Sequence, residues 1–446
     1  MMHKILLVLV GATFATLQFC GVPGSGRVDK VGDRPDSDLV TKPVDYACID
    51  AVSTNCSVSF LSSDKTKANL TTSFLVFGGG GAPDYNEIAL EKNLLYFQRT
   101  LAKLGYEPEQ AAMFFANGND GEATIRYIDE VDGTEKYKVP EIPHLRGAAT
   151  PENLQAWLAT DRQANAANRD LFFYFTGHGT LNRRNADNNA MMLWYEEAVS
   201  VQQFANLLDQ LPADKTVTAM MAQCYSGSFA NFIYKDGNPK KSLSSQNRCG
   251  FFATVKTQPS VGCTPAVDES DYRDYSSSFF AGLSGRDRTG KPVPSADYDR
   301  DGQVSYAEAH AFAKVDEYTT DLPISTSEAW LQLRSSRLLR YQIFRQPISK
   351  LLKTARPEQR YVVDELVKRF NFNPDYSYSK NVEDFAIDNA SGGDPIDSAA
   401  EQAYLTRLQM ELINISMEQR TRAARNPRRI ADLDRIVSCE QSSWQP

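Results

Sequence analysis

The sequence predicts an α/β protein: a mainly parallel sheet flanked by helices, followed by a helical C-terminal region. Two observations support this. Short apolar segments that read as buried strands alternate with helical patterns, an order that favours parallel pairing. From about residue 326 the strands stop, and apolar residues recur at spacings of three and four. We therefore expect a core domain over residues 70–325 and a helical region over 326–446.

The first half of the core opens with a strand over 73–77 that runs into four glycines. Because no Lys-Ser/Thr pair follows, we interpret the glycines as a flexible loop and not as a phosphate loop. The spacing of Leu90, Leu94 and Leu101 predicts a helix that ends near Gly105. A strand over 111–115, a polar insertion over 118–149 and a helix opening at Thr150-Pro151 complete this half.

Two further strands each end in a reactive residue. One spans 170–175 and runs into Thr-Gly-His178-Gly179, and the other spans 215–222 and runs into Gln-Cys224-Tyr-Ser-Gly. A short segment over 191–195 and a helix over 201–211 lie between them, and a strand over 250–255 follows. Because parallel sheets place their sites at the carboxyl ends of strands, an imidazole and a thiol should lie side by side.

This pair suits nucleophilic catalysis. A thiol attacks as the thiolate and needs a partner that accepts its proton, which His178 can do. The small residues around Gly179 and Cys224 let a carbonyl approach backbone N–H groups that would form an oxyanion hole. The alternative is a buried core cysteine beside a capped loop histidine.

The two blocks, FYFTGHG and AQCYSGS, resemble the caspase-like clan of cysteine peptidases, most closely the legumain-like (asparaginyl endopeptidase) family. The resemblance covers about residues 70–320. It implies a caspase-like fold and hydrolysis of a peptide or protein substrate through a thioester acyl-enzyme. It also implies that Asn86, in the segment Asp-Tyr-Asn, orients the His178 ring. A transpeptidase on the same dyad, or a catalytically silent calcium-binding scaffold, are the alternatives.

The chain departs from the legumain pattern in the specificity pocket. Ile88 stands where the family has an Arg, and Ala222 stands where it has a Glu. Asp274 matches the family's third pocket residue and is the expected substrate-binding residue. An unpaired buried carboxylate favours a cationic partner, so we expect cleavage after Arg or Lys over cleavage after Asn. The family's helical tail can cover the active site, so residues 326–446 should either cap the cleft or support the core.

Residues 297–308 match a calcium-binding EF-hand loop. Asp297, Asp299 and Asp301 occupy positions one, three and five, and Glu308 occupies position twelve. The Gln303 carbonyl and Ser305 complete the set, and hard oxygen ligands at this spacing suit one structural Ca²⁺. Pro292 and Pro294 disfavour a long helix before the loop. The alternative is an acidic surface turn without a metal.

The ends of the chain bear on its location. Residues 1–21 read as a signal peptide, with Lys4 before a short apolar run, and residues 22–69 as a polar extension. We therefore expect an exported protein without a transmembrane segment after leader removal; lipidation at Cys20 is an alternative to plain cleavage. The net charge of −8 argues against a nucleic-acid partner. Oligomeric state is not predicted.

Seven cysteines are present, and export makes disulfides plausible. With Cys20 and Cys224 set aside, the short-range options are Cys48 with Cys56 and Cys249 with Cys263. These pairings would leave Cys439 unpaired, although sequence does not determine connectivity.

Overall fold

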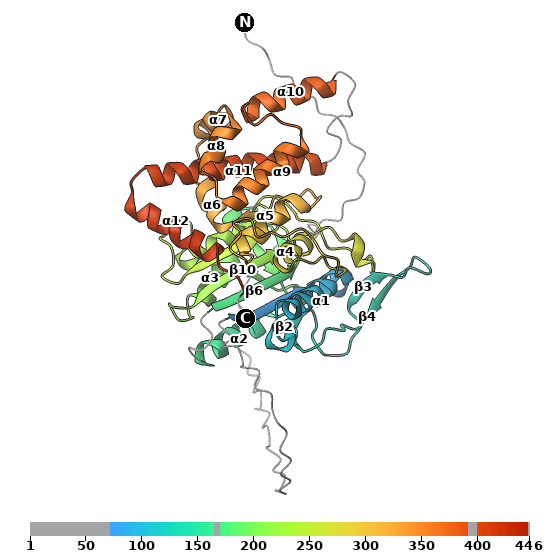
Figure 1. The fold of residues 1–446 in the computed structure, drawn as a ribbon. Helices are drawn as coiled ribbons and strands as arrows, with labels where there is room; N and C mark the ends of the chain where they lie inside the picture. Colours follow the sequence, from blue (N-terminus) through green and yellow to red (C-terminus); the bar gives the residue numbers. More distant parts are fainter. Residues whose placement is uncertain (1–71, 165–169, 391–398, 445–446) are drawn as a thin grey trace, which may run out of the picture. The chain divides into compact units, whose positions relative to one another are not determined.

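A seven-stranded sheet forms the centre of the computed structural model, which describes residues 72–164, 170–390 and 399–444 (Figure 1). Its strand order is β12-β11-β10-β6-β1-β2-β5. All neighbouring strands are parallel except β11 and β12. The predicted α/β class, with a mainly parallel sheet flanked by helices, is therefore confirmed. The expected signal peptide, the extension over 22–69, Cys20 and the Cys48–Cys56 option lie outside the described residues.

The strands of this sheet are short and apolar. They span β1 Thr72–Gly79, β2 Ala112–Phe115, β5 Leu145–Gly147, β6 Asp170–Gly177, β10 Thr216–Ala222, β11 Arg248–Phe252 and β12 Ile324–Ser325. The central three are buried on both faces, which explains their continuous runs of apolar residues. Helices cover both sides of the sheet: α1 (Ile88–Lys103), α2 (Pro151–Ala164), α3 (Val201–Leu208), α4 (Tyr275–Ser284) and α5 (Tyr306–Asp316).

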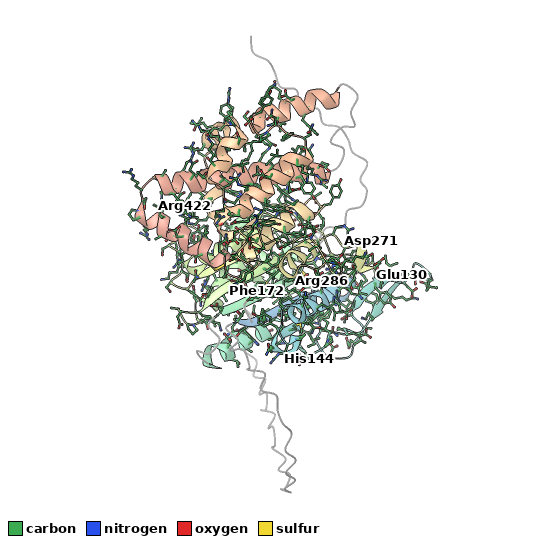
Figure 2. The ribbon with its side chains drawn as sticks, in the orientation of Figure 1. Glu130, His144, Phe172, Asp271, Arg286 and Arg422 are labelled. Carbon is green, nitrogen blue, oxygen red and sulfur yellow. A yellow bond between two sulfur atoms is a disulfide. The ribbon has the colours of Figure 1, made fainter. Side chains whose placement is uncertain are left out.

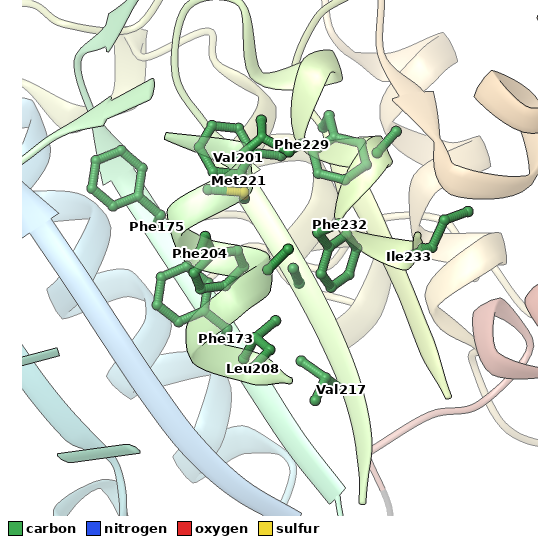
Figure 3. Close-up of a cluster of buried hydrophobic side chains, with 14 of the residues drawn as sticks. Phe173, Phe175, Val201, Phe204, Leu208, Val217, Met221, Phe229, Phe232 and Ile233 are labelled. Carbon is green, nitrogen blue, oxygen red and sulfur yellow. The ribbon is translucent and has the colours of Figure 1, made fainter. Parts of the chain in front are cut away.

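Alternate residues of β6 face the two sides of the sheet. Phe173 and Phe175 belong to a core that includes Phe204 of α3 and Phe229 of the 3₁₀ helix η5 (Ser226–Ile233), as Figure 3 shows. Each fully buried aromatic side chain contributes on the order of 1.5–3 kcal/mol to stability. This core fixes the helix that follows Cys224 against the sheet.

The other face carries Phe172 and Tyr174, which pack with α1, α4 and α5. Phe172 lies in the interior, whereas Glu130 lies far out on the hairpin between β3 (Ile125–Ile128) and β4 (Glu135–Lys138), as Figure 2 shows. Phe97 of α1 stacks on Tyr174 with ring centroids 5.5 Å apart. His178 and Cys224 occupy positions on this same face, because they follow Thr176 and Ala222 by two residues.

The predicted polar insertion over 118–149 contains strands. Its hairpin pairs β3 (Ile125–Ile128) with β4 (Glu135–Lys138), and β5 joins the edge of the main sheet. A small three-stranded sheet of β7 (Gly179–Thr180), β8 (Ala190–Met192) and β9 (Ala198–Ser200) follows His178. The apolar segment expected over 191–195 therefore forms a strand only at its start.

The helical region begins with two short helices. They are α6 (Thr326–Gln332) and α7 (Arg337–Phe344). The break occurs because Ser336 caps α7 by accepting the backbone N–H of Leu339 at 3.2 Å. Ser325 starts α6 in the same way, in a capping box with Glu328.

The helical region continues with α8 (Ile348–Leu351), α9 (Pro357–Arg369), α10 (Tyr378–Ala390), α11 (Ala399–Ala423) and α12 (Pro427–Glu440). Helices α9 and α11 lie side by side (Figure 1) and share an apolar core of their own. Of the two roles considered for this region, the structure favours support of the core. Trp444 packs edge-on against Phe74 and Phe172 with ring centroids 5.0 Å away in each case.

Two further contacts tie this region to the sheet. Arg407 of α11 is buried and donates to the carbonyls of Lys314, Glu317, Thr319 and Asp321. A disulfide joins Cys249 of β11 to Cys439 of α12. The predicted pairing of Cys249 with Cys263 is therefore wrong, and so is an unpaired Cys439. Cys263 is also disulfide-bonded.

Candidate functional site

The carboxyl ends of β6 and β10 meet at one edge of the sheet. Their last paired residues are Thr176 and Ala222, so His178 and Cys224 each stand two residues beyond the same rung. A Cβ on Gly179 would lie 2.0 Å from the carbonyl oxygen of Cys224, so only glycine fits there. The structure therefore brings together the two strand ends, as the sequence predicted.

The His178 ring is held from one side. Its Nε2 lies 2.8 Å from the carbonyl oxygen of Tyr85 and 3.0 Å from Oε2 of Glu87. Two acceptors at Nε2 fix the proton on that nitrogen. Within the described residues, Nδ1 is buried without a hydrogen-bond partner. The lone pair on Nδ1 is therefore available as a base.

The residue that orients His178 is Glu87 and not Asn86. The Asn86 side chain accepts the backbone N–H of Gly80 at 2.9 Å and donates to the carbonyl of Thr124 at 3.3 Å. It therefore holds the glycine loop in place. The predicted role of Asn86 in orienting the imidazole is therefore wrong. The side chain that contacts the ring belongs to the next residue, Glu87. A carboxylate next to the predicted Asn was the only sequence signal for this role.

Glu87 is held as a carboxylate. Burial raises its pKa, but hydrogen bonds from His178 and Arg126 outweigh burial and leave the pKa below its usual value. Arg126 Nη2 lies 2.8 Å from the second carboxylate oxygen. A negative charge therefore faces the imidazole and would stabilise its protonated form.

Cys224 is buried, and its sulfur is in contact with the backbone of Ser260. The Ser260 N–H lies 3.1 Å from Sγ, and Sγ lies 3.5 Å from the Ser260 carbonyl oxygen. Burial raises the pKa of the Cys224 thiol well above its usual value. The thiol is therefore protonated at neutral pH in this arrangement, and the segment at Ser260 covers it.

Asp321 holds that segment. One carboxylate oxygen accepts the Ser260 hydroxyl, and the other accepts the Val261 N–H at 3.1 Å. Burial raises the pKa of Asp321 to about 7, with hydrogen bonds from Ser260 acting in the opposite direction. Sequence reasoning missed both Ser260 and Asp321, because neither lies in a motif.

The turn after Cys224 is left-handed at Tyr225, where φ is 60°. Its N–H donates to the carbonyl of Gln258 at 2.9 Å, which ties the turn to the segment that covers the thiol. A left-handed tyrosine is uncommon, and such backbone strain is concentrated at functional sites.

Asp274 is buried and begins α4 as its N-cap, accepting the Ser277 N–H at 2.7 Å. Its other oxygen lies 3.7 Å from Nη2 of Arg288, whose side chain is also buried. Arg288 donates to Asn93 and to Ser277 as well. The expectation of an Asp274 carboxylate without a cationic partner is therefore wrong, and Asp274 gives no reason to expect cleavage after Arg or Lys.

The predicted calcium loop brings three carboxylates together. Single oxygens of Asp297, Asp299 and Glu308 all lie within 4.8 Å of one another. Gly302 has φ of 90°, the sharp turn that this loop type needs at its sixth position. Glu308 Oε1 also accepts the N–H of Tyr298 at 2.7 Å. The donor chemistry and the turn fit Ca²⁺.

The other predicted ligands, Asp301, Gln303 and Ser305, make hydrogen bonds that hold the local structure of the loop. Asp301 accepts the N–H of Gln303 at 2.8 Å, and Ser305 caps α5 in a box with Glu308. The loop therefore leads into a helix, but the chain between α4 and α5 contains no helix before it. This agrees with the expectation from the two prolines.

A second group of candidate metal ligands does not make a metal site. Glu87, His178 and Cys263 have ligand-type atoms within 4.8 Å of one another. However, Cys263 is disulfide-bonded and offers no thiolate. Among the described residues, Cys224 is the one free cysteine.

No family model and no curated protein matches this chain. Among solved structures, it is similar to the protein GSU0716 from Geobacter sulfurreducens, with 13% identity and a TM-score of 0.34. That match covers 57% of this chain and 92% of the other. A likeness this distant carries no functional argument. Within the described residues, none of the helices has the length and apolar character to cross a membrane.

Proposed function

We propose that the chain is a cysteine endopeptidase that cleaves peptide bonds with Cys224 as nucleophile and His178 as general base and acid. One observation carries the proposal: at the strand end beside Cys224, the imidazole is held at Nε2 by Tyr85 and Glu87, while its buried Nδ1 has no hydrogen-bond partner among the described residues. A fixed tautomer with a free lone pair is what activation of a thiol requires. The resemblance of the two strand-end segments to caspase-like peptidases agrees with it.

The reaction follows from these groups. Nδ1 of His178 takes the thiol proton, and the thiolate adds to the substrate carbonyl carbon. The N–H groups of Gly179 and Cys224 stabilise the resulting oxyanion. The carbon–nitrogen bond breaks as the imidazolium returns its proton to the leaving amine, which leaves a thioester. Water, deprotonated by His178, then hydrolyses the thioester and releases the acid and the free thiol.

Access to Cys224 requires a movement. Cys224 is 1% exposed, so a carbonyl group cannot reach its thiol while the Ser260 segment covers it. The segment is held at the turn by Gln258 and at its far end by Asp321. In our proposal the substrate displaces Ser260 from the sulfur.

The two alternatives differ from hydrolysis in how the thioester is opened, or in whether a thioester forms at all. A transpeptidase would use a substrate amine in place of water to open the thioester. A silent scaffold would form no acyl-enzyme. Incubating the protein with a pool of peptides under reducing conditions separates the three: mass spectrometry finds cleaved peptides, joined peptides or unchanged peptides. Cys224→Ala should abolish both products, and product formation by that variant would refute the assignment of the nucleophile.

We also propose a structural Ca²⁺ at the loop over 297–308. The convergence of Asp297, Asp299 and Glu308 supports it, because three carboxylates repel one another strongly without a cation. The ion would hold the start of α5 against the loop. It would take no part in the chemistry at Cys224.

Export is the third part of the proposal. The Cys249–Cys439 disulfide supports it, because disulfides persist mainly in oxidising compartments. The apolar segment at the start of the chain is consistent with a leader. Cleavage of that segment, found by N-terminal sequencing of the secreted protein, is the test.

A further inference from the structure

A short stretch of the helical region is strongly basic, although the chain as a whole is acidic. Residues 329–353 contain no aspartate or glutamate, whereas the net charge of the chain is −8. The stretch carries six cationic residues: Arg334, Arg337, Arg340, Arg345, Lys350 and Lys353. The positive charge is therefore concentrated around helix α7 and does not follow from the overall composition.

Helix α7 is held in the protein by one of its faces. Ile343 is fully buried in the apolar core that α9 and α11 share. Leu339 and Phe344 are partly buried and pack against the large core that contains Phe173. Because this face is packed against the protein, the opposite face of α7 is turned outward.

The outward face carries two exposed apolar side chains between two arginines. Leu338 is 66% exposed and Tyr341 is 56% exposed. Arg337 and Arg345 are exposed as well, four residues before and four residues after Tyr341. At about 100° per residue in an α-helix, the four positions fall within about 100° of one another. We call these four residues the α7 surface.

The arginines on and beside the α7 surface are not neutralised by acidic side chains. Arg345 lies over the Tyr341 ring, 5.3 Å from its centroid, and donates to the Tyr341 hydroxyl. Arg340 donates to the Ser335 hydroxyl and to a backbone carbonyl. Within the part of the chain that the structure describes, Arg337, Arg340 and Arg345 form no ion pair. Their charge is therefore available to an anionic partner from outside the chain.

This combination of side chains suits the surface of an anionic lipid bilayer. Guanidinium groups bind phosphate oxygens with paired hydrogen bonds, tyrosine is enriched at the level of the headgroups, and leucine enters the boundary with the acyl chains. Binding of this kind increases with the buried apolar area and with the attraction to anionic lipids. The α7 surface supplies both contributions.

A protein partner fits the α7 surface less well. A stable protein interface needs about 800 Å² from each partner and an apolar centre. Helix α7 has eight residues and exposes two large apolar side chains, which are too few for such a centre. A lipid surface has no such requirement, because each arginine near it raises the partition coefficient by about fivefold.

We propose that the α7 surface binds an anionic lipid bilayer, with Leu338 and Tyr341 in the headgroup region and Arg337 and Arg345 on the lipid phosphates. The chain would lie on the membrane through α7, which at eight residues is far shorter than the roughly 20 that span a bilayer. The inference is independent of the proposed peptidase function, because it concerns another part of the chain and its test measures no turnover.

The test is the co-sedimentation of the purified full chain with vesicles. One kind of vesicle contains phosphatidylcholine and phosphatidylglycerol in equal parts, and the other contains phosphatidylcholine alone. We expect the partition coefficient to be at least about tenfold higher on the anionic vesicles. Raising the salt from about 0.1 to 1 M should reduce this ratio, because it shortens the Debye length from about 10 to 3 Å.

Two double variants should weaken binding to the anionic vesicles. Arg337→Glu combined with Arg345→Glu reverses the charge of the α7 surface, and Leu338→Ser combined with Tyr341→Ser removes its apolar side chains. Each should lower the partition coefficient at least about tenfold. The melting temperature should stay near that of the native protein, because all four positions are exposed.

Matched controls separate the α7 surface from the overall charge and apolar content of the chain. Lys103→Glu combined with Arg146→Glu makes the same change of charge at exposed positions in the core domain. Val131→Ser removes an apolar side chain that is 96% exposed on the hairpin between β3 and β4. Both controls should bind the anionic vesicles as the native protein does.

Four results would overturn the proposal. Equal partition on the two kinds of vesicle, or binding to neither, would show no preference for anionic lipid. Native binding in both α7 variants would place the contact elsewhere, and equal loss in the variants and the controls would assign it to overall charge. Absence of vesicle binding, together with a native dimer that Leu338→Ser with Tyr341→Ser makes monomeric in analytical ultracentrifugation, would make the α7 surface an interface between copies of the chain.

Discussion

The backbone N–H of Ser260 points to the sulfur of Cys224, with 3.1 Å between nitrogen and sulfur. Ser260 is in turn anchored through its hydroxyl to the buried carboxylate of Asp321. The nucleophile is therefore covered by a segment whose position depends on a residue 61 positions further along the sequence than Ser260. The reactivity of Cys224 should therefore depend on the contact between Ser260 and Asp321.

Loss of this anchor should expose the thiol. Asp321→Asn keeps the shape of the side chain but gives Ser260 and Val261 a weaker, neutral acceptor. We expect the rate of Cys224 labelling by a small disulfide reagent to rise about tenfold, since a hydrogen bond to a charged acceptor contributes on the order of 1.5 kcal/mol more than one to a neutral acceptor. Asp316→Asn is the control, because Asp316 binds Ser278 and not the covering segment. Equal labelling of all three proteins would show that Asp321 does not control access.

Asp321 should also make stability depend on pH. Its folded-state pKa of about 7 lies above its ordinary value of 3.8, because burial disfavours the charged form. A raised carboxyl pKa gives stability that is fully present below about pH 4 and is lost as pH rises through about 7. Two buried charged groups lie near Asp321. Burial also raises the pKa of Glu317, whereas the positive charge of Arg407 lowers the pKa of Asp321.

The measurement for this prediction is the melting temperature between pH 4 and pH 8, for the native protein and Asp321→Asn. Stability of the native protein relative to the variant should decrease as pH rises across this range, by a few degrees in melting temperature. Parallel curves for the two proteins would contradict the buried, titrating carboxylate.

Glu87 is predicted to be a positioning residue that acts through His178. Glu87→Gln keeps the size of the side chain but removes the charge that faces Nε2. We expect kcat to fall about 10- to 100-fold with little change in KM, because the imidazolium formed during the reaction loses its counter-charge. Glu141→Gln, at an exposed ion pair with Lys138, is the control and should keep the native kcat; an equal fall of kcat in both variants would indicate a structural role only.

Calcium should stabilise the fold through the loop over 297–308. Binding to the native state alone adds about 2.7 kcal/mol when free ligand exceeds the dissociation constant a hundredfold. Adding millimolar Ca²⁺ to chelator-treated protein should therefore raise the melting temperature by several degrees. Asp299→Ala should remove most of the rise, whereas Asp384→Ala, on the exposed side of α10, should not. Identical melting curves with and without Ca²⁺ would contradict the site.

Local sequence patterns were sufficient to predict the sheet and to place His178 and Cys224 at the ends of neighbouring strands. The apolar runs around Phe173 and Met220 identify buried strands, and parallel pairing brings His178 and Cys224 to one edge. The identity of the residue on the imidazole could not be predicted, because Asn86 and Glu87 are adjacent and only the course of the loop decides which one points inward.

The remaining errors share a cause, which is contact across long sequence separations. Cys249 pairs with Cys439, 190 residues away, because α12 returns to the sheet. Arg288 reaches Asp274 from the turn after α4, and the short β12 joins the sheet from beyond the calcium loop. None of these contacts leaves a periodic or spaced signal in the sequence, so the three-dimensional path of the chain is needed to find them.

The most direct test of the catalytic pair is covalent trapping. The full chain is incubated under mildly reducing conditions with a peptidyl acyloxymethyl ketone, and the site and rate of modification are measured by intact-mass and peptide mass spectrometry. The account predicts one addition per chain, on Cys224, with a rate at least a hundredfold lower in His178→Ala. Modification at another residue, or an equal rate at Cys224 without the imidazole, would contradict the proposal that His178 activates this thiol.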